Sequence, residues 1–239
     1  MSTTPPTSTE PAAEFDAFAG DYDAALQQGL SVSGESKEYF AQGRIQLLQK
    51  HLGRLKFFPQ HVLDYGCGTG TSVPLLHQIT GVEKVHGIDI SAESIREAEK
   101  KYGHPQRVFS TLSSYVPAGN IDLAFCNGVF HHIPLDQRGA AVKMIYDALR
   151  PGGIFCYWEN NPWNPATRYV MSRIPFDRDA ITLTPPESRR LLQSAGFEIH
   201  STNYLFIFPR MLRWLRPMEQ WMTRWPVGTQ YQILSRKPC

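Results

Sequence analysis

The sequence predicts an α/β fold with a mostly parallel sheet, and three observations carry this prediction. Residues 62–70 read VLDYGCGTG, an apolar strand that runs into three glycines and then into a helical pattern. Residues 85–90 form a second apolar strand that includes Asp89 near its end. Further apolar strands alternate with amphipathic helices along the rest of the chain, which is typical of βαβ units.

The glycine-rich turn predicts a ligand site. Glycines at 66, 68 and 70 let a bulky polar ligand approach the backbone, and a helix starting near Gly70 would offer N–H groups to a carboxylate or phosphate. An acid at the tip of the second strand, here Asp89, is suited to hydrogen-bond a ribose diol. Together these features indicate a site for an adenosine-like nucleotide. Thr71 stands where NAD sites usually have glycine or alanine, and Asp64 precedes the first glycine, which is rare in NAD sites.

Four motifs in order identify a family resemblance. The segments LDYGCGTG, GIDIS, IDLAFCNGVFHHI and LRPGGIF resemble the motif series of class I S-adenosylmethionine-dependent methyltransferases. Within that superfamily the chain is similar to the UbiE-like, or methyltransferase type 11, group, which acts on small molecules and lipids. The resemblance is strong over residues 60–158 and loose on both flanks.

The resemblance implies a Rossmann-like, seven-stranded, mostly parallel sheet with helices on both faces and an antiparallel last strand. Residues 1–13 are rich in Thr, Ser and Pro and are expected to form a disordered tail, and the chain length favours one domain, at 14–239. The resemblance implies a helical lid at 14–58, and a helical insertion is expected at 205–228 between the last two strands. The implied cofactor is S-adenosyl-L-methionine. The residues expected to bind it are Tyr22, Arg44, Asp64, Gly66, Cys67, Gly68, Asp89, Ile90, Leu112 and Asn127.

Several of these assignments have plain alternatives. Tyr22 either contacts cofactor or substrate from the lid or only packs its helix, and Arg44 either pairs with the cofactor carboxylate or is a solvated surface side chain. The third strand, at residues 106–110, departs from the family pattern, because Thr111 and Leu112 stand where an acid often bonds the adenine amino group. Backbone groups or a serine hydroxyl would then bind the adenine.

His131, His132 and Glu159 are the candidates for a general base. Imidazole titrates near neutral pH and can take a proton from an attacking hydroxyl, although a structural or cofactor-packing role for the histidine pair is the favoured alternative. Glu159 stands beside two asparagines and a Pro-Trp-Asn-Pro loop at 162–165, and two interpretations are open: these groups bind a polar head group, or the loop only builds turns. No recognised ligand spacing is present, so no metal is expected.

Composition restricts the setting of the protein. A chain of 239 residues can form one sizeable core. Its net charge of +2 does not indicate a surface that binds nucleic acid. Four cysteines without paired spacing favour a reducing, cytoplasmic compartment. The N-terminus lacks the features of a signal peptide, and no run approaches the ~20 apolar residues of a membrane span.

Residues 209–225 lie outside the four motifs and have a stripe of large apolar side chains. Met and Trp side chains recur at helical spacing, arginines lie mostly off that face, and Pro217 is expected to break the segment into two helices. Burial in the core or over the site is the favoured interpretation. A homodimer interface and peripheral contact with a membrane are the alternatives, and membrane contact would suit a lipid-like substrate.

The expected function is methyl transfer from S-adenosyl-L-methionine to a small-molecule or lipid-like acceptor in small-molecule biosynthesis, with O-methylation favoured over N- or C-methylation. A non-catalytic protein that binds the same cofactor is the first alternative. A nicotinamide-dependent oxidoreductase, which would share the nucleotide crevice, is the second.

Overall fold

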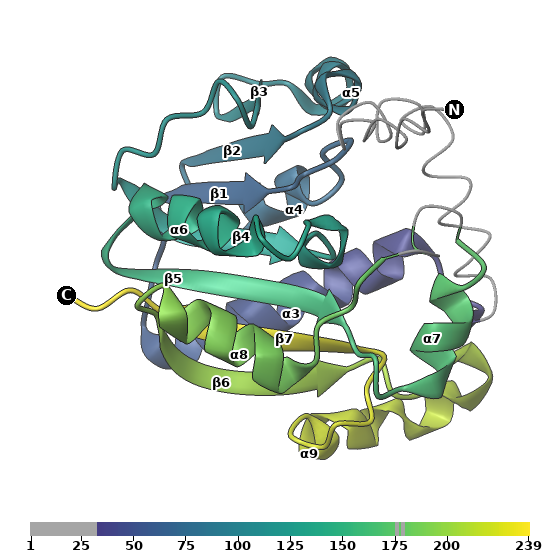
Figure 1. Ribbon diagram of the computed structural model, residues 1–239. Helices are drawn as coiled ribbons and strands as arrows, with labels where there is room; N and C mark the ends of the chain where they lie inside the picture. Colours follow the sequence, from purple (N-terminus) through teal and green to yellow (C-terminus); the bar gives the residue numbers. More distant parts are fainter. Residues whose placement is uncertain (1–32, 175–176, 178–179) are drawn as a thin grey trace, which may run out of the picture.

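The computed structural model describes residues 33–174, 177 and 180–239. The expected tail at 1–13 and the N-terminal helix with Tyr22 lie outside these residues. The described part is built around one seven-stranded sheet with helices on both faces (Figure 1).

The sheet confirms the predicted fold class. Its strand order is β3-β2-β1-β4-β5-β7-β6. Strand β7 pairs antiparallel with β5 and β6, whereas the pairs among β1 to β5 are parallel. The strands are β1 (His61–Tyr65), β2 (Lys84–Asp89), β3 (Arg107–Thr111), β4 (Ile121–Asn127), β5 (Leu149–Asn160), β6 (Glu198–Leu205) and β7 (Gln230–Arg236).

Two helical layers bury the central strands on both faces. Helices α6 (Arg138–Ala148) and α8 (Pro185–Ser194) lie in front of the sheet in Figure 1, and α3 (Lys37–Leu55) and α4 (Val73–His77) lie behind it. Side chains alternate between the two cores: Leu63 and Tyr65 pack with α6, and Val62 packs with α3 and α4. Helix α5 (Ala92–Tyr102) packs against β2 and β3.

Side chains cap the starts of three helices. Ser36 accepts from the backbone of Tyr39 at the start of α3, and Ser91 accepts from the backbone of Ser94 at the start of α5. Thr184 and Glu187 form a capping box at the start of α8.

The helix expected to begin near Gly70 was wrongly placed. Helix α4 begins at Val73 and has five residues. Gly70 has φ of 79°, which a right-handed helix does not accommodate, and Pro74 is suited only to the first turn of a helix. The turn itself, and not a long helix, therefore provides the backbone groups at this edge of the sheet.

The segment after β6 also differs from expectation. It forms a 3-10 helix, η4 (Arg210–Met218), which is kinked at Leu212 and contains Pro217, followed by the short α9 (Glu219–Met222). The expected burial of its apolar face is wrong, because neither helix has a buried residue. Most of the large apolar side chains of this segment are exposed.

The carboxyl ends of the parallel strands carry the remaining short elements. These are the 3-10 helix η2 (Phe130–His132) after β4 and helix α7 (Pro165–Met171) after β5. In Figure 1, α7 and η4 lie toward the same edge of the sheet. Among the described helices, none has the length and apolar character needed to cross a bilayer.

Candidate active site

The glycine-rich turn leaves β1 and bends across the edge of the sheet. Gly66 has φ of 71°, and a Cβ there would lie 2.3 Å from a methyl group of Val129, so no other residue fits without displacement. A Cβ at Gly68 would meet nothing within 4 Å. The backbone at Gly68 therefore faces open space that a ligand can occupy.

Asp89, at the end of β2, supports this turn. One carboxylate oxygen accepts from the Gly68 N–H at 2.8 Å, and the other accepts from the Ser91 N–H at 2.9 Å. The N–H groups of Gly66 and Cys67 donate to the Ile88 carbonyl at 2.8 and 3.0 Å. The conformation of the turn is thus fixed by groups of β2.

Two cavities meet at this turn. The first, of about 390 Å³, lies between the turn, α3, α7 and the segment before η4. The second, of about 350 Å³, lies between the turn, Asp89, Leu112 and α6. Both are lined by Gly66, Gly68, Thr69, Asn127, Gly128 and His132. A ligand that occupies both cavities would therefore pass directly over the turn.

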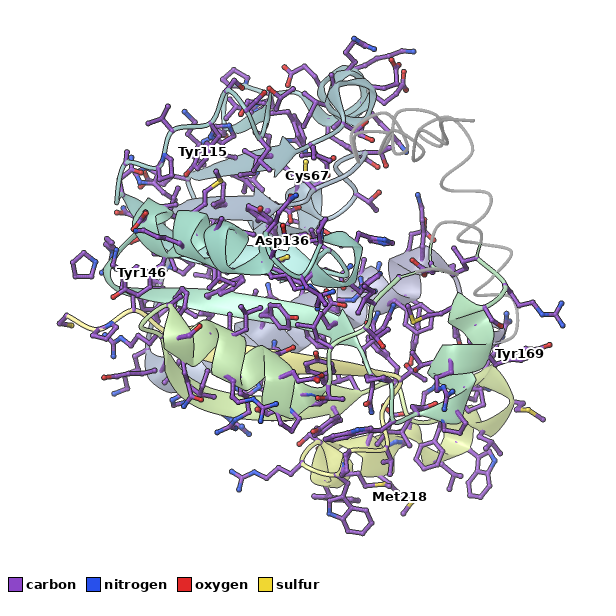
Figure 2. The ribbon with its side chains drawn as sticks, in the orientation of Figure 1. Cys67, Tyr115, Asp136, Tyr146, Tyr169 and Met218 are labelled. Carbon is purple, nitrogen blue, oxygen red and sulfur yellow. The ribbon has the colours of Figure 1, made fainter. Side chains whose placement is uncertain are left out.

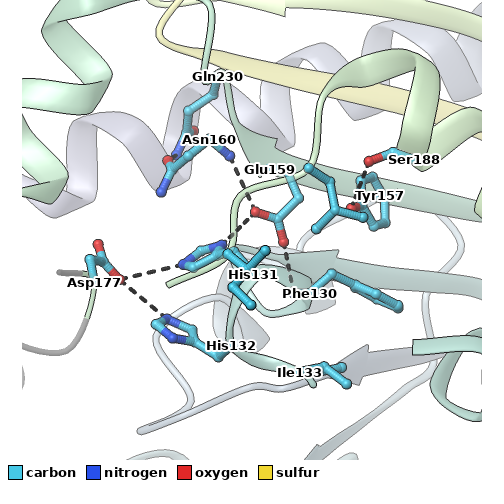
Figure 3. A network of polar contacts seen from close by, with 12 residues as sticks. Phe130, His131, His132, Ile133, Tyr157, Glu159, Asn160, Asp177, Ser188 and Gln230 are labelled. Atoms are coloured by element: carbon cyan, nitrogen blue, oxygen red, sulfur yellow. Dashed lines mark hydrogen bonds and ion pairs between the residues drawn. The ribbon is translucent and has the colours of Figure 1, made fainter. Parts of the chain in front are cut away.

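A buried polar network lies at the floor of the first cavity (Figure 3). His131 is 4 % exposed, and its Nδ1 lies 2.5 Å from a carboxylate oxygen of Glu159. The other oxygen of Glu159 accepts from the Phe130 N–H at 2.7 Å. Asp177 Oδ1 lies 3.4 Å from His131 Nε2 and 3.2 Å from His132 Nε2. One carboxylate thus contacts both histidines.

The two histidines differ in protonation. Burial by itself would lower the pKa of His131, but the carboxylates of Glu159 and Asp177 outweigh it and raise the pKa to about 10. Burial lowers the pKa of His132, and the His131 cation lowers it further against the opposing hydrogen bond to Asp177. Burial would raise the pKa of Asp177, but hydrogen bonds from both histidines hold it well below its usual range. At neutral pH, His131 is a cation and His132 is neutral.

The same groups meet the geometric requirement for a metal site. In the part of the chain that the structure describes, the ligand atoms of His131, His132 and Asp177 lie within 4.8 Å of one another. A metal ion would have to displace the proton on His131, which already lies between two carboxylates. This arrangement therefore favours proton handling over metal binding.

Comparisons with known proteins agree with this geometry. A sequence model described as a methyltransferase domain matches residues 62–153. A trans-aconitate 2-methyltransferase of Rhodopseudomonas palustris is 26 % identical over 118 residues, which are 49 % of this chain and 45 % of that protein. A carboxy-S-adenosyl-L-methionine synthase of Campylobacter curvus is 33 % identical over 119 residues, 48 % of this chain and 50 % of that protein.

Residues 62–153 thus match a methyltransferase domain, and the relatives support the resemblance to class I S-adenosylmethionine-dependent methyltransferases. The chain spans about half the length of the curated relatives that it matches. Among solved structures, the [4+2]-cyclase SpnF superposes with a TM-score of 0.67 at 17 % identity, covering 99 % of each chain. At that identity the likeness shows the Rossmann-like fold alone.

The residues around the turn of this methyltransferase domain fit the cofactor of the family, S-adenosyl-L-methionine. Asp64 Oδ2 and Asn127 Oδ1 are buried side-chain atoms with no hydrogen-bond partner among the described residues, and both residues line the first cavity. Such acceptors suit an ammonium or hydroxyl donor. Burial, and then the nearby charge of Asp89, raise the pKa of Asp64 to about 8. A cationic donor would therefore stabilise the buried carboxylate of Asp64.

The structure brings most of the predicted cofactor residues of the methyltransferase domain to these two cavities. Asp89, Ile90 and Leu112 line the second cavity, and Arg44, Asp64 and Cys67 line the first. Gly66, Gly68 and Asn127 line both, whereas Tyr22 lies outside the described residues. Arg44 is partly buried at the first cavity, where it donates from Nε to Gln230 Oε1 at 2.9 Å.

The three base candidates lie in different positions. His132 lines both cavities and His131 lines the first. Glu159 is 1 % exposed and lies behind His131, where it contacts the imidazole and backbone N–H groups. Glu159 is therefore placed to position His131.

Sequence reasoning missed Asp177, which lies 46 residues beyond His131. Its only local signal is an acid in the segment PFDRDA, which matches no motif. Sequence reasoning also missed the cluster at the far wall of the first cavity. There Arg216 pairs with Glu35 at 2.8 Å and lies over the ring of Tyr39, 4.6 Å from its centroid.

Proposed function

We propose that this protein transfers the methyl group of S-adenosyl-L-methionine to a hydroxyl of a small-molecule or lipid-like acceptor. The observation that carries the proposal is the position of His132, which lines both the nucleotide-side cavity and the larger cavity beside it. A neutral histidine lies where a cofactor and an acceptor would meet. The four free cysteines support the expected reducing, cytoplasmic setting.

Cofactor binding uses the groups at the turn. Asp89 accepts from the ribose hydroxyls, Ile90 and Leu112 contact the adenine, and Asp64 and Asn127 accept from the methionine end. Arg44 pairs with the carboxylate of the cofactor. Helix α3, the part of the expected lid at 14–58 that the structure describes as a helix, lines the first cavity. The bound sulfonium supplies an activated methyl group, so no covalent intermediate on the protein is needed.

The acceptor lies in the first cavity. Apolar side chains from α3, α7 and the segment after β6 line it, including Phe40, Val170, Met171, Phe206 and Phe208. His131, His132 and Asp177 are its polar groups on one side. This arrangement suits an acceptor with an apolar body and a hydroxyl directed at the histidines.

His132 is the general base that accepts the proton of the acceptor hydroxyl. When the Nε2–H of neutral His132 donates to Asp177, the lone pair of the imidazole is on Nδ1 and accepts the hydroxyl proton. Asp177 then stabilises the imidazolium that forms. The His131 cation, held by Glu159, balances the charge of Asp177 and keeps His132 neutral beforehand. The protein otherwise contributes proximity and alignment.

The first test is calorimetry with S-adenosyl-L-methionine, its demethylated product and NAD. We expect both sulfur compounds to bind and NAD not to bind, and we expect methyl transfer to one class in a panel of hydroxylated apolar acceptors. Binding of the sulfur compounds without turnover on the panel would favour a non-catalytic binding protein. Binding of NAD alone would indicate the oxidoreductase alternative and contradict the proposal.

Replacing Asp89 with Ala should weaken binding of S-adenosyl-L-methionine by about 100-fold, because the variant loses charge-assisted ribose hydrogen bonds and the support of Gly68. Calorimetry measures the loss. Glu97→Ala, which removes an exposed acid on α5, is the matched control and should leave affinity unchanged. Unchanged affinity in the Asp89 variant would refute the assignment.

Binding of S-adenosyl-L-methionine should also release a proton from Asp64. The free carboxyl has a pKa of about 8 and is largely protonated at pH 7, whereas a bound ammonium favours the carboxylate. Affinity should therefore rise as the pH increases toward 8 and level off above it. Calorimetry in buffers of different ionisation enthalpy measures the proton count, and the Asp64→Asn variant should show no release. Equal release by the variant would assign the proton elsewhere.

A further inference from the structure

The segment that follows β6 has an outer surface of large apolar side chains. Met211, Trp214 and Trp221 are 83 %, 72 % and 74 % exposed, and Met218 and Trp225 are exposed as well. Met218 lies at the outer edge of the molecule in Figure 2. Three of the five tryptophans of the chain thus lie on one short segment. We name these five residues the aromatic surface.

The charges around the aromatic surface have one sign. Between residues 210 and 225, the exposed charged side chains are Arg210, Arg213 and Arg224. The acid of this segment, Glu219, is partly buried and accepts from the Phe208 N–H at 2.9 Å. The outer side of the segment therefore combines apolar bulk with positive charge.

Specific contacts on the inner side hold the segment in this orientation. Arg216 donates to Glu35 at 2.8 Å and to the Phe208 carbonyl at 3.2 Å. The Tyr204 N–H donates to the Thr223 carbonyl at 2.6 Å. Because polar groups fix the inner side, the tryptophans are directed outward by the fold and are not side chains displaced from the core.

The position of the segment links it to the first cavity. Phe206, Ile207, Phe208 and Pro209 line that cavity, and η4 begins at the next residue. A surface that covered the aromatic side chains would therefore lie beside the cavity wall.

We propose that the aromatic surface, with Arg210, Arg213 and Arg224, binds the surface of a membrane that contains anionic lipids. Tryptophan is favoured at the boundary between head groups and acyl chains, and nearby arginines attract anionic head groups. A second copy of the chain fits less well, because a two-fold interface built on this surface would bring the arginines of both copies, which carry like charges, into one interface. Delivery of a lipid-like acceptor from the membrane rests on the proposed function, whereas membrane binding itself does not.

The test is sedimentation of the full chain with phosphatidylcholine vesicles, with and without phosphatidylglycerol. We expect binding to the anionic vesicles, a blue shift of tryptophan fluorescence, and weaker binding as salt is raised. The double variant Trp214→Ala/Trp221→Ala should bind at least ~10-fold more weakly, since it loses two buried indoles. Arg213→Gln and Arg224→Gln should each weaken binding about fivefold, and only on anionic vesicles.

Matched controls separate this surface from general effects. Trp163→Ala removes a half-exposed tryptophan before α7, and Lys100→Gln and Lys143→Gln remove exposed cations on α5 and α6. All three should bind vesicles as the wild type does. Binding of S-adenosyl-L-methionine by each variant confirms that it is folded, so that a failed vesicle test and a failed cofactor test are distinguishable.

Three results would overturn the proposal. The first is no binding of the full chain to either vesicle, and the second is equal binding by the Trp214/Trp221 double variant. The third is a dimer of the wild type in solution, measured by light scattering, that becomes monomeric in the double variant. That result would assign the aromatic surface to a second copy of the chain.

Discussion

Replacing His132 with Ala should lower the rate of methyl transfer by about 10²–10⁴-fold, the usual contribution of a positioned general base. Binding of S-adenosyl-L-methionine should change little, because the ribose and methionine ends of the cofactor contact other residues. The measurement is kcat with the acceptor found in the panel. His200→Ala is the matched control, since His200 is an exposed histidine on β6.

The pH profile adds a second readout for His132. A base must be deprotonated to act, and the pKa of His132 is lowered below 6.5. The rate of the wild type should therefore stay constant down to pH 6.5 and fall only at more acidic pH. The residual rate of the His132 variant should not show this fall. A chelator should leave the wild-type rate unchanged. Loss of activity with chelator and recovery with added metal would instead make His131, His132 and Asp177 metal ligands.

Replacing Glu159 with Leu should lower the free energy of unfolding by about 3–5 kcal/mol, the cost of removing one partner from a buried ion pair. The variant leaves the His131 cation with Asp177 alone at 3.4 Å and leaves the Phe130 N–H without its acceptor. Urea unfolding measures the loss. Glu198→Leu, at an exposed position on β6, is the control and should change stability by less than about 0.5 kcal/mol.

The pH dependence of this loss has a defined sign. The pKa of His131 is about 10 in the folded protein and 6.5 in an ordinary environment, so the stability from its cation is complete below pH 6.5 and disappears as the pH rises toward 10. The difference in the free energy of unfolding between the wild type and the Glu159 variant should become smaller over that pH interval. The double variant Glu159→Leu/His131→Leu should recover part of the loss, because no unpaired charge remains buried. A gap independent of pH would contradict the charged network.

Sequence reasoning succeeded where one local segment carries the whole signal. The strand that runs into a glycine-rich turn and the acid at the end of β2 were predicted and are present. These features depend on residues within a few positions of one another. The seven-stranded, mostly parallel sheet with an antiparallel last strand followed from the family resemblance, and the pairing of β7 with β5 and β6 confirms it.

Sequence reasoning failed where the structure depends on distant contacts. The stripe at 209–225 has helical spacing that would fit burial, but Pro217 and the kink at Leu212 shorten the helix, and inner polar contacts turn the tryptophans outward. The pairing of Asp177 with the two histidines has no counterpart in local spacing. The different protonation of His131 and His132 follows from burial and from carboxylates on other elements.

The sequence by itself determined the fold class, the glycine-rich turn, the acid that braces it and the methyltransferase family. The turn and the α/β pattern follow from backbone sterics and residue periodicity, which act over a few residues, whereas the family follows from the resemblance of four motifs. Only the tertiary structure decided which histidine is neutral, that Glu159 lies behind His131, and that the aromatic surface faces outward. Those properties depend on burial and on charges brought together from distant parts of the chain, and neither can be calculated before the chain is folded.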